Sequence, residues 1–236
     1  QFLDMEGKER GELDLIRRYR DIALHPECDS AIEDIVNEAI VSDERDQAVS
    51  VSLDRLEYSQ KIKNKIKEEF NNVLALLDFN TKGHDIFRRW YVDGRIYYHK
   101  IIDSSNPKSG LQELRYIDPR KIKKVREIEK GKDKSGAEVI VNVDEFYIYN
   151  EKGIEYATGS ANGLRLTKDS IAYCPSGLID AQKNLVLSHL HKAIKPVNQL
   201  RMIEDALVIY RISRAPERRI FYIDVGNLPK AKAEQY

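Results

Sequence analysis

The sequence predicts an α+β fold with helices at both ends of the chain and strands in between. Apolar residues recur at three- and four-residue intervals up to about residue 90 and again after residue 181, which is the spacing of one helical face. Between residues 95 and 173 they alternate with polar residues and are separated by turn sequences, as in strands joined by loops. The order of these patterns predicts N-terminal helices, a central mainly antiparallel β region, then a long kinked helix, a strand and the start of another helix.

Four helices are expected in the N-terminal part. The first covers residues 12–25, and its apolar face consists of Leu13, Ile16, Ala23 and either Tyr19 or Arg20. Pro26 ends it and suits the first turn of the next helix, whose apolar positions are Ile32, Ile35, Val36, Ala39 and Ile40. The third follows Ser59, a candidate N-cap, with the clearest stripe of all, at Ile62, Ile66, Phe70, Val73 and Leu77. A fourth is expected from about Lys82 to Tyr91, and residues 48–53 alternate like a strand.

Turn sequences divide the middle of the chain into short strands. Asp93–Gly94 and Asp118–Pro119 are turn signals. The segments with strand character are residues 95–103, 111–119, 121–130, 137–145, 146–150 and 164–173. Lysines in 121–130 favour an exposed sheet edge that is protected from aggregation.

The C-terminal part returns to helical spacing. Its recurring apolar positions are Leu187, Leu190, Ile194, Val197, Leu200, Ile203, Leu207 and Tyr210. Pro196 interrupts them, which predicts a kink or two abutting helices. Residues 218–225 have the pattern of a strand, and Pro229 suits the first turn of a helix that has only begun at Tyr236. This unfinished helix and the missing initiator Met predict an excerpt of a longer polypeptide.

The charge of the chain is balanced overall but uneven along its length. The 236 residues contain 39 basic and 39 acidic side chains. Residues 1–60 hold 16 acids and 7 bases, whereas residues 120–134 hold 8 bases and 3 acids, and residues 182–236 hold 10 bases and 5 acids. Such asymmetry suits contact between unlike surfaces of neighbouring copies, a basic face toward an anion, or simply solvated faces.

Motifs that would indicate catalysis or a cofactor are absent from the sequence. It contains no phosphate-binding glycine loop, no dinucleotide fingerprint and no paired Cys or His motif for zinc, so we expect no cofactor, no metal and no enzyme. Two distant cysteines, Cys28 and Cys174, favour a reduced, intracellular chain. Asp118 is expected to be a turn residue. Two alternatives stay open: a nucleic-acid-binding module that uses residues 120–134 and 211–219, and a nuclease whose acids the sequence does not identify.

Residues 188–236, and above all the string RAPERRIFYIDVGN, closely resemble the portal proteins of T4-like tailed bacteriophages. LRYIDPRKI and WYVDGRIYYHKII are similar to the same family. In the order of parts that the resemblance implies, residues 1–227 form the wing domain and residues 228–236 begin the first stem helix. The clip, the second stem helix and the crown are then absent from this sequence.

The resemblance also implies a function. Portal proteins form a ring of twelve copies at one vertex of the capsid, located in the virion and assembled in the host cytoplasm. The ring is the conduit for packaging and ejection of double-stranded DNA, which passes without being read. Its implied partners are other copies of the chain, the major capsid protein, the terminase large subunit and neck proteins.

Four arginines lie beside the wing-to-stem joint: Arg211, Arg214, Arg218 and Arg219. We expect them to make bidentate ion pairs with carboxylates, either within the subunit or on its neighbour. The local candidates are Glu204, Asp205, Glu217 and Asp224. Because the resemblance implies that stem helices line the channel, Lys230 and Lys232 are the residues expected to approach DNA.

Overall fold

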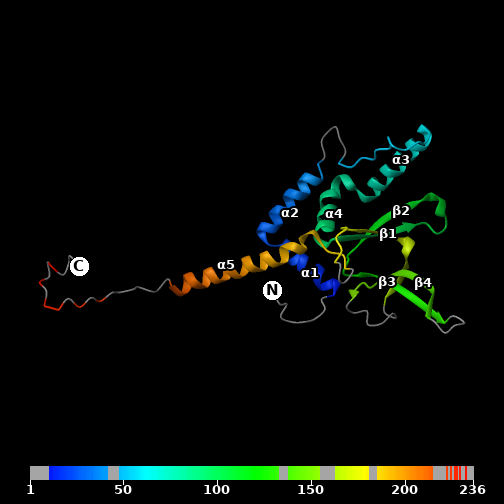
Figure 1. Ribbon diagram of the computed structural model, residues 1–236. Helices are drawn as coiled ribbons and strands as arrows, with labels where there is room; N and C mark the ends of the chain where they lie inside the picture. The colour runs from blue at the N-terminus through cyan, green and yellow to red at the C-terminus, as the bar shows by residue number, and fades with distance from the viewer. Residues whose placement is uncertain are drawn as a thin grey trace. The chain divides into compact units, whose positions relative to one another are not determined.

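A computed structural model describes residues 11–41, 48–132, 138–154, 163–180 and 185–214, with isolated positions up to 232; for 128–132 and 138–142 it describes the backbone (Figure 1). The chain divides into two compact units, residues 1–194 and residues 195–236. The α-helices are α1 (Glu12–Ala23), α2 (Pro26–Ala39), α3 (Gln60–Leu77), α4 (Phe79–Asp93) and α5 (Ile194–Arg214). The strands are β1 (Arg95–Ile102), β2 (Leu111–Ile117), β3 (Ile122–Lys132), β4 (Glu138–Tyr149), β5 (Leu164–Thr167) and β6 (Ile171–Pro175). This arrangement confirms the predicted α+β fold.

Helix α4 is central to the helical part of the first unit, because α1, α2 and α3 all pack against it (Figure 1). The core there contains Leu15, Tyr19, Ala23, Ile32, Val36, Val92 and Leu190. Tyr19 is fully buried, while its neighbour Arg20 takes part in ion pairs. Tyr19, and not Arg20, therefore belongs to the apolar face of α1. Helix α3 has the predicted span after Ser59, but its apolar stripe is only half-buried and Ile62 remains 47% exposed.

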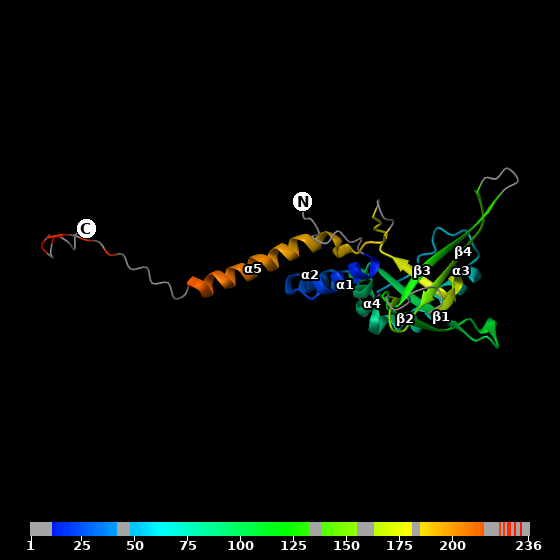
Figure 2. The same ribbon diagram turned by 90° about the horizontal axis from the view of Figure 1, so that it is seen from below.

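Two antiparallel sheets of three strands form the rest of the first unit (Figures 1 and 2). Their strand orders are β2-β1-β6 and β3-β4-β5. Tyr97 and Ile171 of one sheet pack with Ile122 and Tyr147 of the other in a second core. In the second sheet β3 is an edge strand with exposed Lys123, as its lysines predict.

Three strand predictions are wrong in detail. Residues 48–53 form no strand, because alternation alone does not supply the neighbouring strand that a ladder of hydrogen bonds requires. Residues 138–149, predicted as two strands, form the single strand β4. Residues 164–173, predicted as one segment, contain β5 and most of β6, separated by a 3-10 turn at Lys168–Ser170 and belonging to different sheets.

The C-terminal helix begins later than its apolar pattern suggests. Residues 185–188 are not helical, and Val186 instead forms a β-bridge with Ile179. A 3-10 turn at His189–Ala193 then runs directly into α5, so the helical pattern is divided shortly before Pro196, while α5 itself continues through this proline. Pro196 lies in the first turn of α5, where its missing N–H removes no helical hydrogen bond.

Most of the predicted strand over residues 218–225 lies outside the described residues. So does most of the helix expected after Pro229, although the Lys232 N–H donates to the Pro229 carbonyl at 2.8 Å. None of the described helices combines the length and apolar character that a membrane span requires.

Candidate functional site

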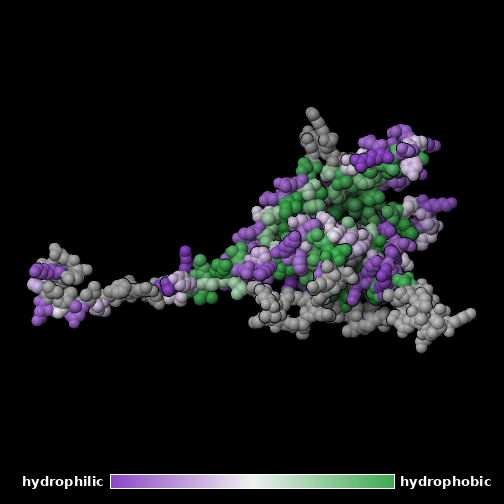
Figure 3. Space-filling model, viewed as in Figure 1, coloured by the Kyte–Doolittle hydropathy of each residue, from purple (hydrophilic) through white to green (hydrophobic). Residues whose placement is uncertain are grey.

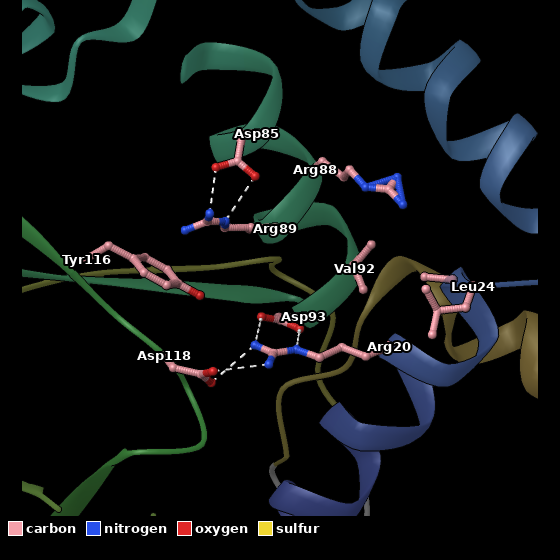
Figure 4. A pocket seen from close by; sticks show the side chains of 10 residues that line it. Arg20, Leu24, Asp85, Arg88, Arg89, Val92, Asp93, Tyr116 and Asp118 are labelled. Carbon is pink, nitrogen blue, oxygen red and sulfur yellow. Dashed lines mark hydrogen bonds and ion pairs between the residues drawn. The ribbon is translucent and has the colours of Figure 1, made fainter. Parts of the chain in front are cut away.

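A pocket of about 460 Å³ lies in the first unit between α1, α4 and the end of β2 (Figure 4). Its lining combines three arginines, three aspartates, one tyrosine and apolar side chains from α1 and α4. The lining residues are Arg20, Ala23, Leu24, Asp85, Arg88, Arg89, Val92, Asp93, Tyr116 and Asp118. Charged residues dominate this pocket, so what it can bind depends on what each charge contacts.

The guanidinium of Arg20 lies between two carboxylates (Figure 4). Its Nε and Nη2 donate to the two oxygens of Asp93 at 2.8 and 2.7 Å. Its Nη1 and Nη2 donate to the two oxygens of Asp118 at 3.1 Å each. Both contacts have the bidentate geometry that makes arginine–carboxylate pairs strong and directional. One side chain of α1 therefore connects the end of α4 to the end of β2.

The chain placement of Asp93 explains why it requires a cation. It is the last residue of α4 and is only 2% exposed. A carboxylate at a helix C-terminus faces the negative end of the helix dipole, and a buried charge without a partner is costly. Arg20 supplies that positive charge and so stabilises the buried carboxylate at the end of α4.

Three groups of the pocket have pKa values that are shifted away from neutral pH. Burial acts to raise the pKa of Asp118, but hydrogen bonds from Arg120 and Arg20 outweigh burial and hold that pKa well below its usual range. The hydrogen bond to Asp93 raises the pKa of Arg20 still further above its usual value, against the effect of burial. Burial, followed by the charges of the two aspartates, raises the pKa of Tyr116 to about 12. Groups that keep one charge state are poorly suited to general acid–base catalysis.

The other two pocket arginines also have carboxylate partners. Arg89 forms an ion pair with Asp85, one helical turn earlier on α4, and its guanidinium lies 4.7 Å from the centre of the Tyr116 ring. Arg88 donates to Asp29 at 2.5 Å and so connects α4 to α2. Each of the three pocket arginines thus has a carboxylate partner, although the buried Nη1 of Arg88 has no hydrogen-bond partner among the described residues.

The start of β1 is a second buried junction. Gly94 has a φ of +71°, and a Cβ there would lie 2.7 Å from the Leu187 carbonyl oxygen. Arg95 is 1% exposed; it forms an ion pair with Glu12 and donates to the Val186 carbonyl. The fully buried Ser188 donates to the Tyr91 carbonyl at 3.0 Å. These hydrogen bonds connect residues 186–188 to α4 and β1, and the ion pair of Arg95 connects β1 to the first turn of α1.

A third charged group lies on the β3-β4-β5 sheet. Glu145 accepts from Lys168 at 2.8 Å, from Arg126 at 2.9 Å and from Lys124 at 3.1 Å. Hydrogen bonds from Lys168 and then Lys124 are the main causes that lower the pKa of Glu145 to about 2. Two of the basic residues of segment 120–134 therefore already have a carboxylate partner, which weakens the case for that segment as a phosphate-binding surface.

The residues that the sequence singled out belong to the second unit, residues 195–236. Arg211, Arg214, Glu204 and Asp205 all lie exposed on α5. The Arg214 guanidinium stacks over the Tyr210 ring at 4.1 Å.

The other predicted residues are at the C-terminal end of the chain. Asp224 accepts from the Gly226 N–H at 2.9 Å in a local turn, and Lys232 is exposed. Arg218, Arg219, Glu217 and Lys230 lie outside the described residues. Their predicted ion pairs and DNA contacts therefore stay predictions.

The sequence reasoning missed the ion pairs of Arg20, Asp93, Asp118 and Glu145. Asp118 does occupy a turn, accepting from the Arg120 N–H at 2.9 Å, but its more consequential contact is with Arg20. The signal that was available is the position of Asp93, an acid at the end of an amphipathic helix. In the described part of the chain no group of three or more His, Cys, Asp or Glu side chains is arranged to hold a metal ion.

The fold and these charged junctions define a class of protein: a mixed α+β domain whose charged side chains connect its own elements. Comparison with known proteins identifies the family. The sequence matches the family described as Bacteriophage T4-like portal protein (Gp20) over residues 12–236. The chain therefore belongs to the T4-like portal protein family.

Two curated relatives support this membership. The chain is 46% identical to the portal protein of Vibrio phage KVP40 over 231 residues, covering 94% of this chain and 44% of that protein. It is 38% identical to the portal protein of Salmonella phage ViI over 234 residues, covering 94% of this chain and 42% of that protein. The chain thus spans less than half the length of both relatives.

Proposed function

We propose that the chain is part of a structural subunit of the portal ring at one vertex of a phage capsid. The observation that carries this proposal is the family match over residues 12–236, with 46% identity to a named portal protein. In this role residues 1–227 are the wing domain and residues 228–236 begin the first stem helix. The ring has twelve copies and serves as the conduit through which double-stranded DNA is packaged and ejected.

The partners of this ring are the major capsid protein, the terminase large subunit and the neck proteins. The chain acts in the virion and during assembly in the host cytoplasm, and it carries no catalytic role. The ion pairs of Arg20 with Asp93 and Asp118 hold helices and a strand in place. Such contacts support a structural role, in shape and attachment, rather than a role in proton transfer.

Electron microscopy of the intact portal protein tests this function. We expect closed rings, and image classes should show twelve copies. A protein that stays monomeric at micromolar concentration, or that turns over duplex DNA with Mg²⁺ on its own, would overturn the proposal.

The DNA-facing role of the stem start has its own test. Lys230 and Lys232 lie in the segment proposed to open the stem helix, so replacing both with glutamate places negative charge beside the DNA. The expected result is a smaller amount of packaged genome per head, measured by nuclease-protected DNA. Unchanged filling in heads that contain normal rings contradicts a DNA contact at these two lysines.

A further inference from the structure

A second hollow in the first unit gathers basic side chains from three parts of the chain. Its volume is about 260 Å³. Arg17 comes from α1, Arg120 and Lys121 come from the turn between β2 and β3, and Lys152 comes from the turn after β4. The other described lining residues are Leu13, Gly153 and Ile154. Four cations and no carboxylate thus line this hollow in the described part of the chain, and we call it the basic hollow.

Backbone hydrogen bonds hold the two turns of the basic hollow together. The Asn150 N–H donates to the Lys121 carbonyl at 2.9 Å, and the Ile154 N–H donates to the Arg120 carbonyl at 3.1 Å. Within the second turn the Lys152 N–H donates to the Oδ1 of Asn150 at 3.0 Å. The backbone therefore keeps these cations near one another, although like charges repel.

Two of the four cations have no carboxylate partner among the described residues. They are Lys121 and Lys152, and both lie at least partly open to solvent. Arg120 contacts Asp118 through its Nε and Nη2, so its charge is largely balanced, but its Nη1 is not used by that carboxylate. Arg17 has an interaction elsewhere in the chain. The positive charge that remains unbalanced in the basic hollow is therefore that of the two lysines.

Acidic residues of α1 limit the positive region. Glu12 and Asp14 line an adjoining hollow of about 280 Å³, which shares Leu13 and Ile154 with the basic hollow. A long anionic polymer that crossed both hollows would meet these carboxylates and be repelled. The surroundings thus favour one compact anion over an extended one, so the basic hollow does not amount to a surface that holds duplex DNA.

We propose that the basic hollow binds an oxyanion, a phosphate or carboxylate group held between Lys121 and Lys152. Lysine ammonium groups contact such anions as point charges, and the free Nη1 of Arg120 adds a directional donor. The bound anion would remove the repulsion between cations that the backbone holds together. All of these residues belong to the first unit, so the site does not depend on the proposed ring.

Pyrophosphate binding to the intact portal protein tests the site. Isothermal titration calorimetry in a buffer without phosphate should show saturable binding with one site per copy. Lys121→Gln with Lys152→Gln is expected to weaken this binding by about tenfold or more, because two charged donors are lost. The matched control is Lys65→Gln with Lys67→Gln, which removes the same charge from two exposed lysines of α3, a helix on which Figure 3 shows hydrophilic side chains. The control is expected to bind as tightly as the unmodified protein.

A dicarboxylate identifies which oxyanion the site prefers. If glutarate displaces pyrophosphate, the site accepts carboxylates as well, such as the acidic side chains of a partner; if it does not, the site selects phosphate groups. Either result supports an oxyanion site when the binding also depends on Lys121 and Lys152. No saturable binding of either anion, or an equal loss of affinity in the control variant, overturns the proposal.

Lysine acetylation gives a second measurement on the unmodified protein, so it does not depend on how the variants fold. Acetylation by an N-hydroxysuccinimide ester is followed residue by residue by mass spectrometry. Saturating pyrophosphate is expected to slow acetylation of Lys121 and Lys152 and to leave Lys65 and Lys67 unchanged. Equal rates with and without pyrophosphate at the two hollow lysines contradict the proposal.

Discussion

Arg20 connects three elements of the first unit through its two carboxylate partners. Replacing it with alanine leaves the buried Asp93 without a cation at the negative end of α4. Because removing one member of a buried pair is far more costly than never having had the pair, we expect Arg20→Ala to lower the free energy of unfolding by about 3 kcal/mol. Urea denaturation followed by circular dichroism measures the change.

Two controls accompany the Arg20 substitution. Arg20→Lys keeps the charge but not the bidentate geometry, so an intermediate loss is expected. Arg115→Ala removes an exposed arginine whose one ion pair among the described residues is with Glu113, and its effect is expected to stay within about 0.5 kcal/mol. If Arg20→Ala has no larger effect than Arg115→Ala, the junction does not stabilise the fold.

Gly94 permits the close approach of α4, β1 and residues 187–188. Gly94→Ala adds a Cβ 2.7 Å from the Leu187 carbonyl oxygen and from the Ser188 Cα, and we expect it to lower the free energy of unfolding by more than about 2 kcal/mol. Gly177 is the control, because its φ of +83° is similar but a Cβ there meets no atom within 4 Å. Gly177→Ala therefore reports the strain of a positive φ without a close contact. Equal losses in the two variants would show that the close approach contributes nothing.

At the scale of elements, Glu145 couples β4 to β3 and to the turn after β5. Its pKa is lowered to about 2, so its favourable contacts are present above the unfolded value of about 4.5 and are lost as the pH falls to about 2. The destabilisation caused by Glu145→Gln is therefore expected to be largest at neutral pH and to vanish near pH 2. A carboxyl resonance of Glu145 that titrates near pH 4.5 in NMR spectra would contradict the coupling.

Two elements, α3 and β4, show how much of the secondary structure could be predicted from the sequence. Helix α3 was predicted almost to its ends because local spacing and an N-cap position determine it. The continuity of β4 through Asp144 and Glu145 was missed, because two adjacent acids interrupt an apolar pattern. In the structure both are paired, Asp144 with Arg165 and Glu145 with three cations.

The charged junctions were less predictable than the elements for a physical reason. Arg20 pairs with residues 73 and 98 positions away in the chain, and local spacing says nothing about such partners. The sequence could therefore indicate that Asp93 and Asp118 are at turns, but not that one guanidinium lies between them.

At the scale of the whole molecule, the balance of charge argues against a surface that holds DNA tightly. Basic and acidic residues number 39 each, and Lys124, Arg126 and Lys168 share the carboxylate of Glu145. Affinity for duplex DNA grows with each phosphate that free cations neutralise. DNA would slide more easily through a conduit that has few free cations, because each free cation holds a phosphate.

We therefore expect weak duplex binding with little salt dependence. In fluorescence anisotropy the plot of log K against log salt concentration should have a slope smaller than about 2 in magnitude, which corresponds to about two phosphates or fewer. Glu145→Gln with Asp144→Asn releases cations on the β3-β4-β5 sheet and should bind duplex more tightly and with a steeper slope. A steep slope in the unmodified chain would instead favour a nucleic-acid-binding module. A steep slope that disappears when the arginines at 211, 214, 218 and 219 are replaced with glutamine would assign that binding to the C-terminal segment.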